Sequence, residues 1–168
     1  MGILKDIFSG ESTSEYVKIL KGTDLFGDLS EAEIERISKY FRHTRYKAGD
    51  VIFQEGKQGD VMYVIRTGAV DVVKRLEDGT DKVLASLVDG SLFGELAILD
   101  ESERSATVVA RAPVEMMELY RASLLELMKN EPRIAVKVIF QLARLVGEKL
   151  RDSGDRMKTV FMQRASAK

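Results

Sequence analysis

The sequence predicts an α+β domain in which helices at both ends flank a centre of short strands. Apolar residues recur three or four positions apart before about residue 47 and again after Tyr120, which is the helical period. Between these two regions lie six short segments rich in β-branched and aromatic residues and separated by glycines. The chain has 168 residues, of which 45% are hydrophobic and 32% charged, as expected for one globular domain.

Two helices are expected at the N-terminal end. Within residues 1–22, apolar residues about one turn apart indicate an amphipathic helix that packs on the domain or contacts a membrane surface: Ile3, Leu4, Ile7 and Phe8. The second helix follows Ser30, because Ser30 and Glu33 match the Ser-x-x-Glu capping box, in which each side chain accepts from a backbone N–H of the first turn. Its apolar face is predicted to carry Ile34, Ile37 and Phe41.

The central segments are predicted to form strands at residues 51–53, 61–66, 69–75, 82–87, 106–111 and 114–120. Asp78-Gly79, between two of them, is a hairpin-turn sequence. Short strands at this spacing are typical of an all-β sandwich, roll or barrel.

Two further helices are predicted after the strands. One covers residues 122–129, and a long one begins at Pro132 and ends at about Ser153, where Gly154 is expected to break it. A basic tail, residues 154–168, then remains. On the long helix, apolar residues with heptad spacing either pack on the strands or pair with a second copy: Ile139, Leu142 and Val146, with Lys149 interrupting the pattern.

The composition excludes several classes of function. The chain contains no cysteine, so it has no disulfide, iron–sulfur cluster, thiolate zinc site or cysteine nucleophile. His43 is the single histidine, which argues against a histidine-ligated metal, a Ser-His-Asp relay and a cupin-type metalloenzyme. We therefore predict a protein that is not an enzyme and binds no metal.

Charge and hydropathy indicate the surroundings of the protein. The net charge of −1 gives no global field for nucleic acid, so no specific DNA binding is expected. No apolar run of roughly 18 residues is present, and the N-terminus lacks a long apolar secretory segment. We expect no membrane span and a cytoplasmic location.

Residues 90–110 contain the pattern most indicative of a ligand. One helical turn, at residues 95–99, is predicted between two strands and begins after Gly94. The first N–H groups of such a turn have no helical partner and carry partial positive charge, which suits an anion. Arg104 and Ser105 add a guanidinium and a hydroxyl.

Two interpretations of these residues stay open. In one, Arg104 holds a phosphate while the Glu95 carboxylate accepts a hydrogen bond from a ribose 2′-hydroxyl. In the other, Arg104 forms a surface ion pair with one of its acidic neighbours, Asp100, Glu101 or Glu103. Such an exposed pair contributes little to stability.

A family resemblance favours the first interpretation. The stretch Phe93-Gly94-Glu95-Leu96-Ala97, followed by Arg104-Ser105-Ala106, resembles the phosphate-binding cassette of the cyclic-nucleotide-binding domain family, in the form of the catabolite activator proteins. The similarity covers roughly residues 18–153 and includes Gly49-Asp50, Gly59-Asp60, Tyr63 and Gly68. It implies an eight-stranded antiparallel β-roll, a jelly-roll-like double-stranded β-helix at about residues 47–120, in a domain spanning 23–153. It also implies a ligand, cAMP or cGMP, held by all eight cassette residues.

The resemblance further implies that Glu95 holds the ribose hydroxyl, that Arg104 pairs with the cyclic phosphate, and that backbone at Leu96-Ala97 and Ser105 assist. Because Ser105 follows the arginine as in bacterial activators, cAMP is expected to bind at least as well as cGMP. Such a domain would signal to a downstream protein through movement of its C-terminal helix, with a homodimer through that helix as one arrangement.

The sequence departs from the bacterial activators in two places. About 15 residues follow the predicted long helix, too few for a helix-turn-helix. Lys149 and Leu150 align approximately with the hydroxyl residues that cap the base in the activators. The alternatives are a scaffold of the same fold that has lost its nucleotide, or a fragment of a larger transcription regulator or channel.

Overall fold

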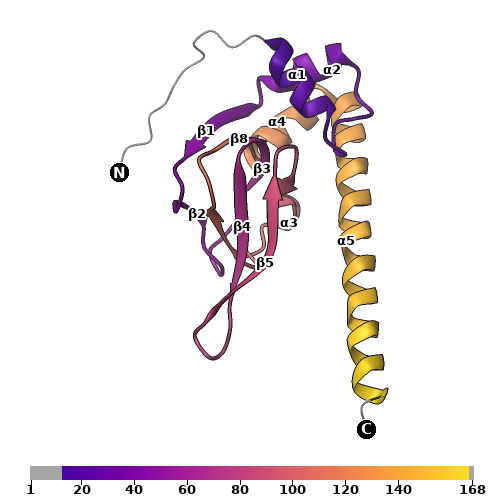
Figure 1. The fold of residues 1–168 in the computed structure, drawn as a ribbon. Coiled ribbons are helices and arrows are strands. Elements are labelled where there is room, and N and C mark those ends of the chain that lie inside the picture. The colour runs from indigo at the N-terminus through magenta and orange to yellow at the C-terminus, as the bar shows by residue number, and fades with distance from the viewer. Residues whose placement is uncertain (1–12, 167–168) are drawn as a thin grey trace.

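The structure is a computed structural model that describes residues 13–166 of the chain (Figure 1). The predicted face of Ile3, Leu4, Ile7 and Phe8 lies outside the described residues. The elements are, in chain order, α1 (Thr13–Lys21), α2 (Glu31–Ser38), β1 (Phe41–Tyr46), β2 (Val51–Phe53), β3 (Val61–Thr67), β4 (Ala69–Arg75), β5 (Asp81–Val88), β6 (Leu92–Phe93), α3 (Glu95–Asp100), β7 (Thr107–Ala110), β8 (Val114–Tyr120), α4 (Arg121–Asn130) and α5 (Pro132–Ser166).

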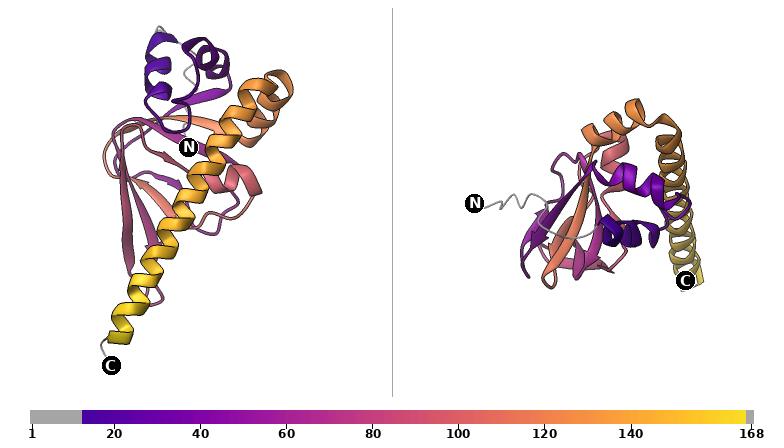
Figure 2. Two further views of the ribbon diagram at one scale, coloured as in Figure 1. Left: turned by 90° about the vertical axis from the view of Figure 1, so that its right-hand side faces the viewer. Right: turned by 90° about the horizontal axis from the view of Figure 1, so that it is seen from above.

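The strands form two antiparallel sheets of four strands each, in the orders β1-β8-β3-β6 and β2-β7-β4-β5. Together they make the β-roll, with α1, α2 and α4 at one end and α5 beside it (Figures 1 and 2). This arrangement confirms the predicted α+β fold class.

Alternation along the strands divides the core into two parts. On β3, Val61, Tyr63 and Ile65 face the second sheet and pack with residues of β4, β7 and β8. Met62 and Val64 point to the other side of the same sheet, where they join Met117, Leu119 and the helices. Because both faces of β3 are covered, its residues from Val61 to Ile65 are buried without interruption.

The second N-terminal helix, α2, begins as the sequence predicts. Ser30 accepts a hydrogen bond from the Glu33 N–H, the Glu33 carboxylate accepts one from the Ser30 N–H, and Ile34 and Ile37 are buried. The prediction for Phe41 is wrong, since α2 ends at Ser38 and Phe41 begins β1. Every residue of β1 is paired with β8, and this long-range pairing outweighs local helical preference.

The six predicted strands all form, at or within one residue of the expected bounds, and the Asp78-Gly79 turn joins β4 to β5 with Gly79 at φ 81°. The pattern missed β1 and the two-residue β6. The roll therefore begins near Phe41 rather than near residue 47.

The predicted end of the long helix is also wrong. α5 continues through Gly154 to Ser166, so most of the predicted basic tail is helical (Figure 1). A glycine inside a helix costs only about 1 kcal/mol relative to alanine, and an Asp155–Lys158 ion pair of 3.2 Å spans the next turn. Of the residues in the predicted heptad seam, Leu142 is fully buried against the domain's own core. Over residues 13–166, the structure contains no helix with the length and apolar character needed to span a bilayer.

Candidate functional site

A cavity of about 340 Å³ opens beside α3. Its walls come from Phe53, from β4 and β5 of the second sheet, from the segment 102–106, and from Lys149 of α5. The structure brings all eight residues predicted for the cassette to this one cavity: Phe93, Gly94, Glu95, Leu96, Ala97, Arg104, Ser105 and Ala106.

The turn of helix predicted after Gly94 forms the inner end of the cavity. α3 covers Glu95–Asp100, and Gly94 precedes it in the left-handed conformation, at φ 76°. A Cβ at Gly94 would lie 2.7 Å from Nη1 of Arg104 and 2.9 Å from the carbonyl oxygen of Val61. Only glycine satisfies both the backbone angle and this close approach. The first N–H groups of α3, which have no partner within the helix, belong to residues that line the cavity.

Arg104 is a buried cation, with 6% of its surface exposed. Its Nη2 donates to the carbonyl oxygen of Val61 at 2.8 Å and its Nη1 to that of Gly94 at 3.4 Å. The guanidinium carbon lies 4.1 Å from the ring centroid of Phe53, a cation–π contact. Among the described residues, no carboxylate forms an ion pair with Arg104, and its Nε has no hydrogen-bond partner.

Burial lowers the pKa of Arg104, and Tyr63, Asp60 and Glu95 oppose that shift only in part. The guanidinium remains charged, because arginine side chains are not deprotonated in proteins. The surface ion pair considered for this residue is absent: Glu101 pairs instead with Arg121, at 2.8 Å. A buried cation with unsatisfied donors beside a cavity is an arrangement that favours an anion in that cavity.

The backbone around Arg104 is held by the loop before β3. Gly56 N–H donates to the Arg104 carbonyl at 2.9 Å, and Arg104 N–H donates to the Lys57 carbonyl at 2.8 Å. Gly59 lies against the guanidinium, where a Cβ would be 2.7 Å from Nε of Arg104 and 2.5 Å from Cβ of Ala97. The absence of a side chain at Gly59 therefore gives Arg104 its place.

Glu95 is the buried acidic residue of the cavity, whose lining also includes the exposed Glu103. It is 5% exposed, and its Oε1 accepts a hydrogen bond from Nζ of Lys149 at 2.8 Å. Lys149 is on α5, 54 positions later in the chain. The buried carboxylate therefore connects the cavity to the long helix.

The remaining cassette residues complete the walls. The Phe93 ring stacks on Tyr63 with centroids 5.0 Å apart, while Ala97 and Ala106 are buried and Leu96 is 44% exposed. Ser105 is exposed, and its carbonyl accepts a hydrogen bond from Nζ of Lys74 at 2.9 Å.

The far end of α3 is tied to the C-terminal helices. Nη1 of Arg121, the first residue of α4, donates to the carbonyls of Ile98 and Leu99 at 2.7 and 2.8 Å. These are carbonyls of the last turn of α3, which a cation at a helix C-terminus stabilises. A displacement of α3 would therefore change the hydrogen bonds that join it to the first residue of α4.

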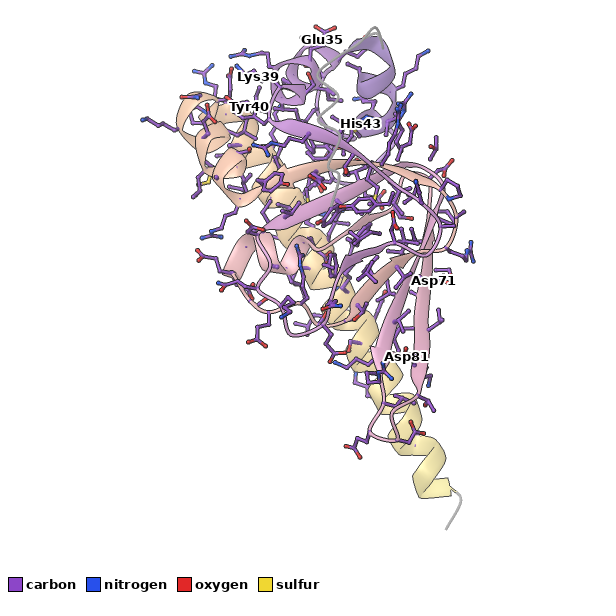
Figure 3. The ribbon with its side chains drawn as sticks, turned by 90° about the vertical axis from the view of Figure 1, so that its left-hand side faces the viewer. Glu35, Lys39, Tyr40, His43, Asp71 and Asp81 are labelled. Atoms are coloured by element: carbon purple, nitrogen blue, oxygen red, sulfur yellow. The ribbon has the colours of Figure 1, made fainter. Side chains whose placement is uncertain are left out.

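The single histidine does not belong to the cavity. His43 lies on β1, near α1 and α2, with its Nε2 3.6 Å from Glu115 (Figure 3). Within residues 13–166, no cluster of three or more acidic or histidine side chains has the geometry of a metal site.

Comparison with known proteins identifies the family. The sequence model described as "Cyclic nucleotide-binding domain" matches residues 43–131, more than half of the chain. The chain belongs to this family. The cyclic AMP receptor protein of Thermus thermophilus is 36% identical to it over 129 residues, which are 77% of this chain and 60% of that protein.

Other members of the cyclic nucleotide-binding domain family are similar over the same region. A cGMP-dependent protein kinase of Caenorhabditis elegans is 34% identical over 67% of this chain and 15% of its own length. The crystal structure of a cyclic nucleotide-binding domain from Methylobacillus flagellatus superimposes with a TM-score of 0.75 at 30% identity, covering 86% of this chain and 81% of that one. The chain thus spans less than two thirds of the length of these two curated relatives.

Sequence reasoning overlooked several residues of this cyclic nucleotide-binding domain's cavity. Gly59 was noticed only as part of a glycine pattern, and Phe53 only as a strand residue. The Val61 carbonyl carries no signal in a side-chain pattern. Lys149 was placed near the ligand only through its approximate alignment with the base-capping positions of the activators, and its contact with Glu95 was missed because nothing local to α5 indicates it.

Proposed function

We propose that this domain is a regulatory module that binds one cyclic nucleotide in the cavity beside α3 and catalyses no reaction. The observation that carries the proposal is the buried Arg104 guanidinium, which has no carboxylate partner among the described residues and lines the cavity next to the first turn of α3. An anionic ligand would supply the missing charge.

The cyclic phosphate is assigned to Arg104 and to the backbone N–H groups of Leu96 and Ala97. A singly charged phosphodiester matches one guanidinium and the partial positive charge at the start of α3. Ser105, exposed at the cavity, can add a hydroxyl donor.

The ribose is assigned to Glu95. Its carboxylate accepts hydrogen bonds only, and a ribose 2′-hydroxyl next to the cyclic phosphate donates one. The apolar walls from Phe53, Val72, Ala85 and Leu87 suit the flat face of a purine.

We assign cAMP as the preferred ligand, with cGMP as the weaker one. The support is the Ser105 position and the similarity to a protein named as a cyclic AMP receptor. The similarity to a cGMP-dependent kinase supports the competing assignment, so the two nucleotides must be compared directly.

The signal is proposed to leave through the C-terminal helices. Ligand at the first turn of α3 would shift the last turn, where Arg121 ties it to α4, while Lys149 joins α5 to Glu95. The energy for this movement is the difference in ligand affinity between the two helix arrangements. The output is contact with a downstream protein, and specific recognition of DNA by residues 13–166 is not expected.

We also propose that two copies pair through α5, by a different stripe from the predicted one. On the side of α5 opposite its buried residues, small or apolar residues recur at intervals of four and three: Val136, Phe140, Ala143, Gly147, Leu150 and Gly154. Val136, Phe140 and Leu150 are 67%, 65% and 73% exposed. An exposed seam with the heptad period fits a second copy of the same helix.

Sedimentation analysis tests this pairing. Phe140→Glu should convert a dimer to a monomer, while Met128→Glu, at an exposed apolar position of α4 outside the stripe, should leave the dimer intact. A monomeric wild-type protein at micromolar concentration would disprove the pairing.

Two alternatives remain distinct from this function. A scaffold that has lost its nucleotide would bind neither cAMP nor cGMP. All eight predicted residues line the cavity of this chain, which argues against that alternative. A larger regulator or channel containing this domain would bind the ligand in the same way, and the domain bounds 23–153 stay a prediction. The cytoplasmic location likewise stays a prediction.

Calorimetric titration of the full chain decides the question. We expect saturable 1:1 binding of cAMP, weaker binding of cGMP, and no binding of 5′-AMP, whose phosphate is doubly charged and not cyclic. Absence of binding by both cyclic nucleotides would refute the proposed function, and tighter binding of cGMP would reverse the assigned preference.

A further inference from the structure

Lys149 is the only residue from the described part of α5 that lines the cavity. Its Nζ lies 2.8 Å from Oε1 of Glu95, and its own side chain is 55% exposed while that of Glu95 is 6% exposed. The pair thus joins a half-solvated lysine on the outer helix to a carboxylate that is almost completely buried.

The contact settles how the Glu95 carboxylate is oriented. A buried carboxylate needs partners for its charge, and among residues 13–166 Lys149 is the one that forms an ion pair with it. Oε1 is occupied by the ammonium group, and no described residue is hydrogen-bonded to Oε2. The second oxygen therefore keeps its full capacity to accept hydrogen bonds from a ligand in the cavity.

A neutral hydroxyl would not displace the ammonium group. Hydrogen bonds between an ammonium and a carboxylate are charge-assisted and stronger than those from a neutral donor, and a carboxylate has about four lone-pair sites. Both donors can therefore bind Glu95 together, one at each oxygen.

We propose that Lys149 is a positioning residue for ribose recognition: it holds Glu95 through Oε1 and so presents Oε2 to the ligand's 2′-hydroxyl. This inference rests on the proposed function of the cavity. It makes discrimination between a ribose and a 2′-deoxyribose depend on α5. By thermodynamic reciprocity, a bound ribose also favours the helix position in which Lys149 reaches Glu95.

The test compares dissociation constants for cAMP and 2′-deoxy-cAMP, and its readout is their ratio. A general loss of folding or of positive charge changes both constants and leaves the ratio unchanged. We expect Lys149→Met to lower the wild-type ratio about three- to tenfold, in the range of a single partly exposed ion pair or charged hydrogen bond. Lys149→Arg, which can reach the same oxygen, should preserve it.

Two further variants complete the design. Lys158→Met removes another ion-paired lysine of α5, far from the cavity, and should leave the ratio at the wild-type value. Glu95→Ala, which removes the acceptor, should abolish the discrimination, and adding Lys149→Met to it should change the ratio no further, because the two residues act through one contact. If Lys149→Met does not fold, Lys149→Gln gives the same comparison.

The outcomes separate this inference from the proposed function. If the wild-type protein binds no cyclic nucleotide, the proposed function fails. If it binds cAMP with clear preference over 2′-deoxy-cAMP and Lys149→Met keeps that ratio, the positioning role fails alone. Equal weakening of both nucleotides by Lys149→Met would also overturn it, since this result would assign Lys149 a purely electrostatic or structural effect.

Discussion

Gly59 and Arg104 are in such close contact that a Cβ on the glycine would lie 2.7 Å from Nε of the arginine. The same Cβ would lie 2.5 Å from Cβ of Ala97 on α3. Both neighbours belong to the proposed phosphate site, so the size of residue 59 controls its geometry.

Gly59→Ala should therefore weaken cAMP binding more than it weakens folding. Overpacking of this kind costs about 1–3 kcal/mol, and the guanidinium is the group that must move. We expect at least a tenfold rise in the dissociation constant, measured by calorimetry. Gly22→Ala is the matched control, because a Cβ there would meet only backbone carbonyl oxygens at an ordinary contact distance of 3.5 Å, and it should leave affinity unchanged.

Arg104→Ala should remove nucleotide binding while preserving the fold. Truncating one partner of a buried charge-assisted contact typically costs about 2–5 kcal/mol of binding, or roughly 30-fold to several thousand-fold in affinity. Without ligand the variant should melt close to the wild type, since the change also removes a buried cation that has no ion-pair partner among residues 13–166.

A melting series with and without cAMP measures both effects, because ligand binding stabilises the native state by mass action. Arg45→Ala removes an exposed arginine that pairs with Glu115, and it should cost at most about 1 kcal/mol and keep the full cAMP response. Equal cAMP-induced shifts in wild type and Arg104→Ala would disprove the phosphate assignment.

Stability should depend on pH through Glu118. Burial raises the pKa of Glu118, although hydroxyls of Tyr120 and Tyr46 donate to its carboxylate at 2.9 and 3.4 Å. Between the unfolded-state value of about 4.3 and the raised folded-state pKa, the folded protein binds more protons than the unfolded chain. The free energy of unfolding therefore decreases as pH rises through that window.

Glu118→Gln removes this titration. Urea unfolding from below the ordinary glutamate pKa up to neutral pH should show the variant gaining stability relative to wild type as pH rises. Glu35→Gln, at an exposed position, is the control and should show no such trend. A stability difference for Glu118→Gln that is independent of pH would contradict the assigned direction.

Hydrogen exchange should reveal the moving element. Adding cAMP should slow exchange in residues 135–151 of α5, because a helix that covers the ligand gains further contacts when the ligand is bound. Mass spectrometry of peptides from α5 and from residues 94–105 measures both places at once. Protection at 94–105 with no change in α5 would mean that the site binds without shifting the helix.

The sequence pattern predicted those elements whose bounds depend on neighbouring residues. The bounds of β2, β4 and β8 follow from runs of β-branched and aromatic residues between turns, and the start of α2 follows from Ser30 and Glu33. β1 was not predicted, because Arg42 and Arg45 interrupt its apolar residues. Its pairing partner β8 lies some 70 positions away, so no local pattern indicates the pairing. The predicted end of α5 is wrong because Gly154 was expected to end the helix, whereas a glycine destabilises a helix interior much less than a proline does.

In the candidate site too, the residues close in sequence could be predicted, whereas the contact between distant residues could not. Gly94, Glu95 and Arg104 are close in sequence, and their types alone suggest an anion and a hydroxyl. The contact between Glu95 and Lys149 depends on the direction in which α5 passes the roll, which is set by buried residues such as Val138 and Leu142. No periodicity within α5 encodes that direction.

Because α5 continues past Gly154, a small rotation of the helix at the contact between Lys149 and Glu95 would move its far end by a larger distance. Ser166 lies seventeen positions after Lys149, which at 1.5 Å per residue is about 26 Å of helix. A tilt of about 10° around Lys149 would carry the far end roughly 4 Å, the difference between van der Waals contact and separation for most side chains. If the proposed ribose contact shifts α5, a hydrogen bond made or lost at Glu95 would become a displacement at the far end of the helix, which projects beyond the roll (Figure 2).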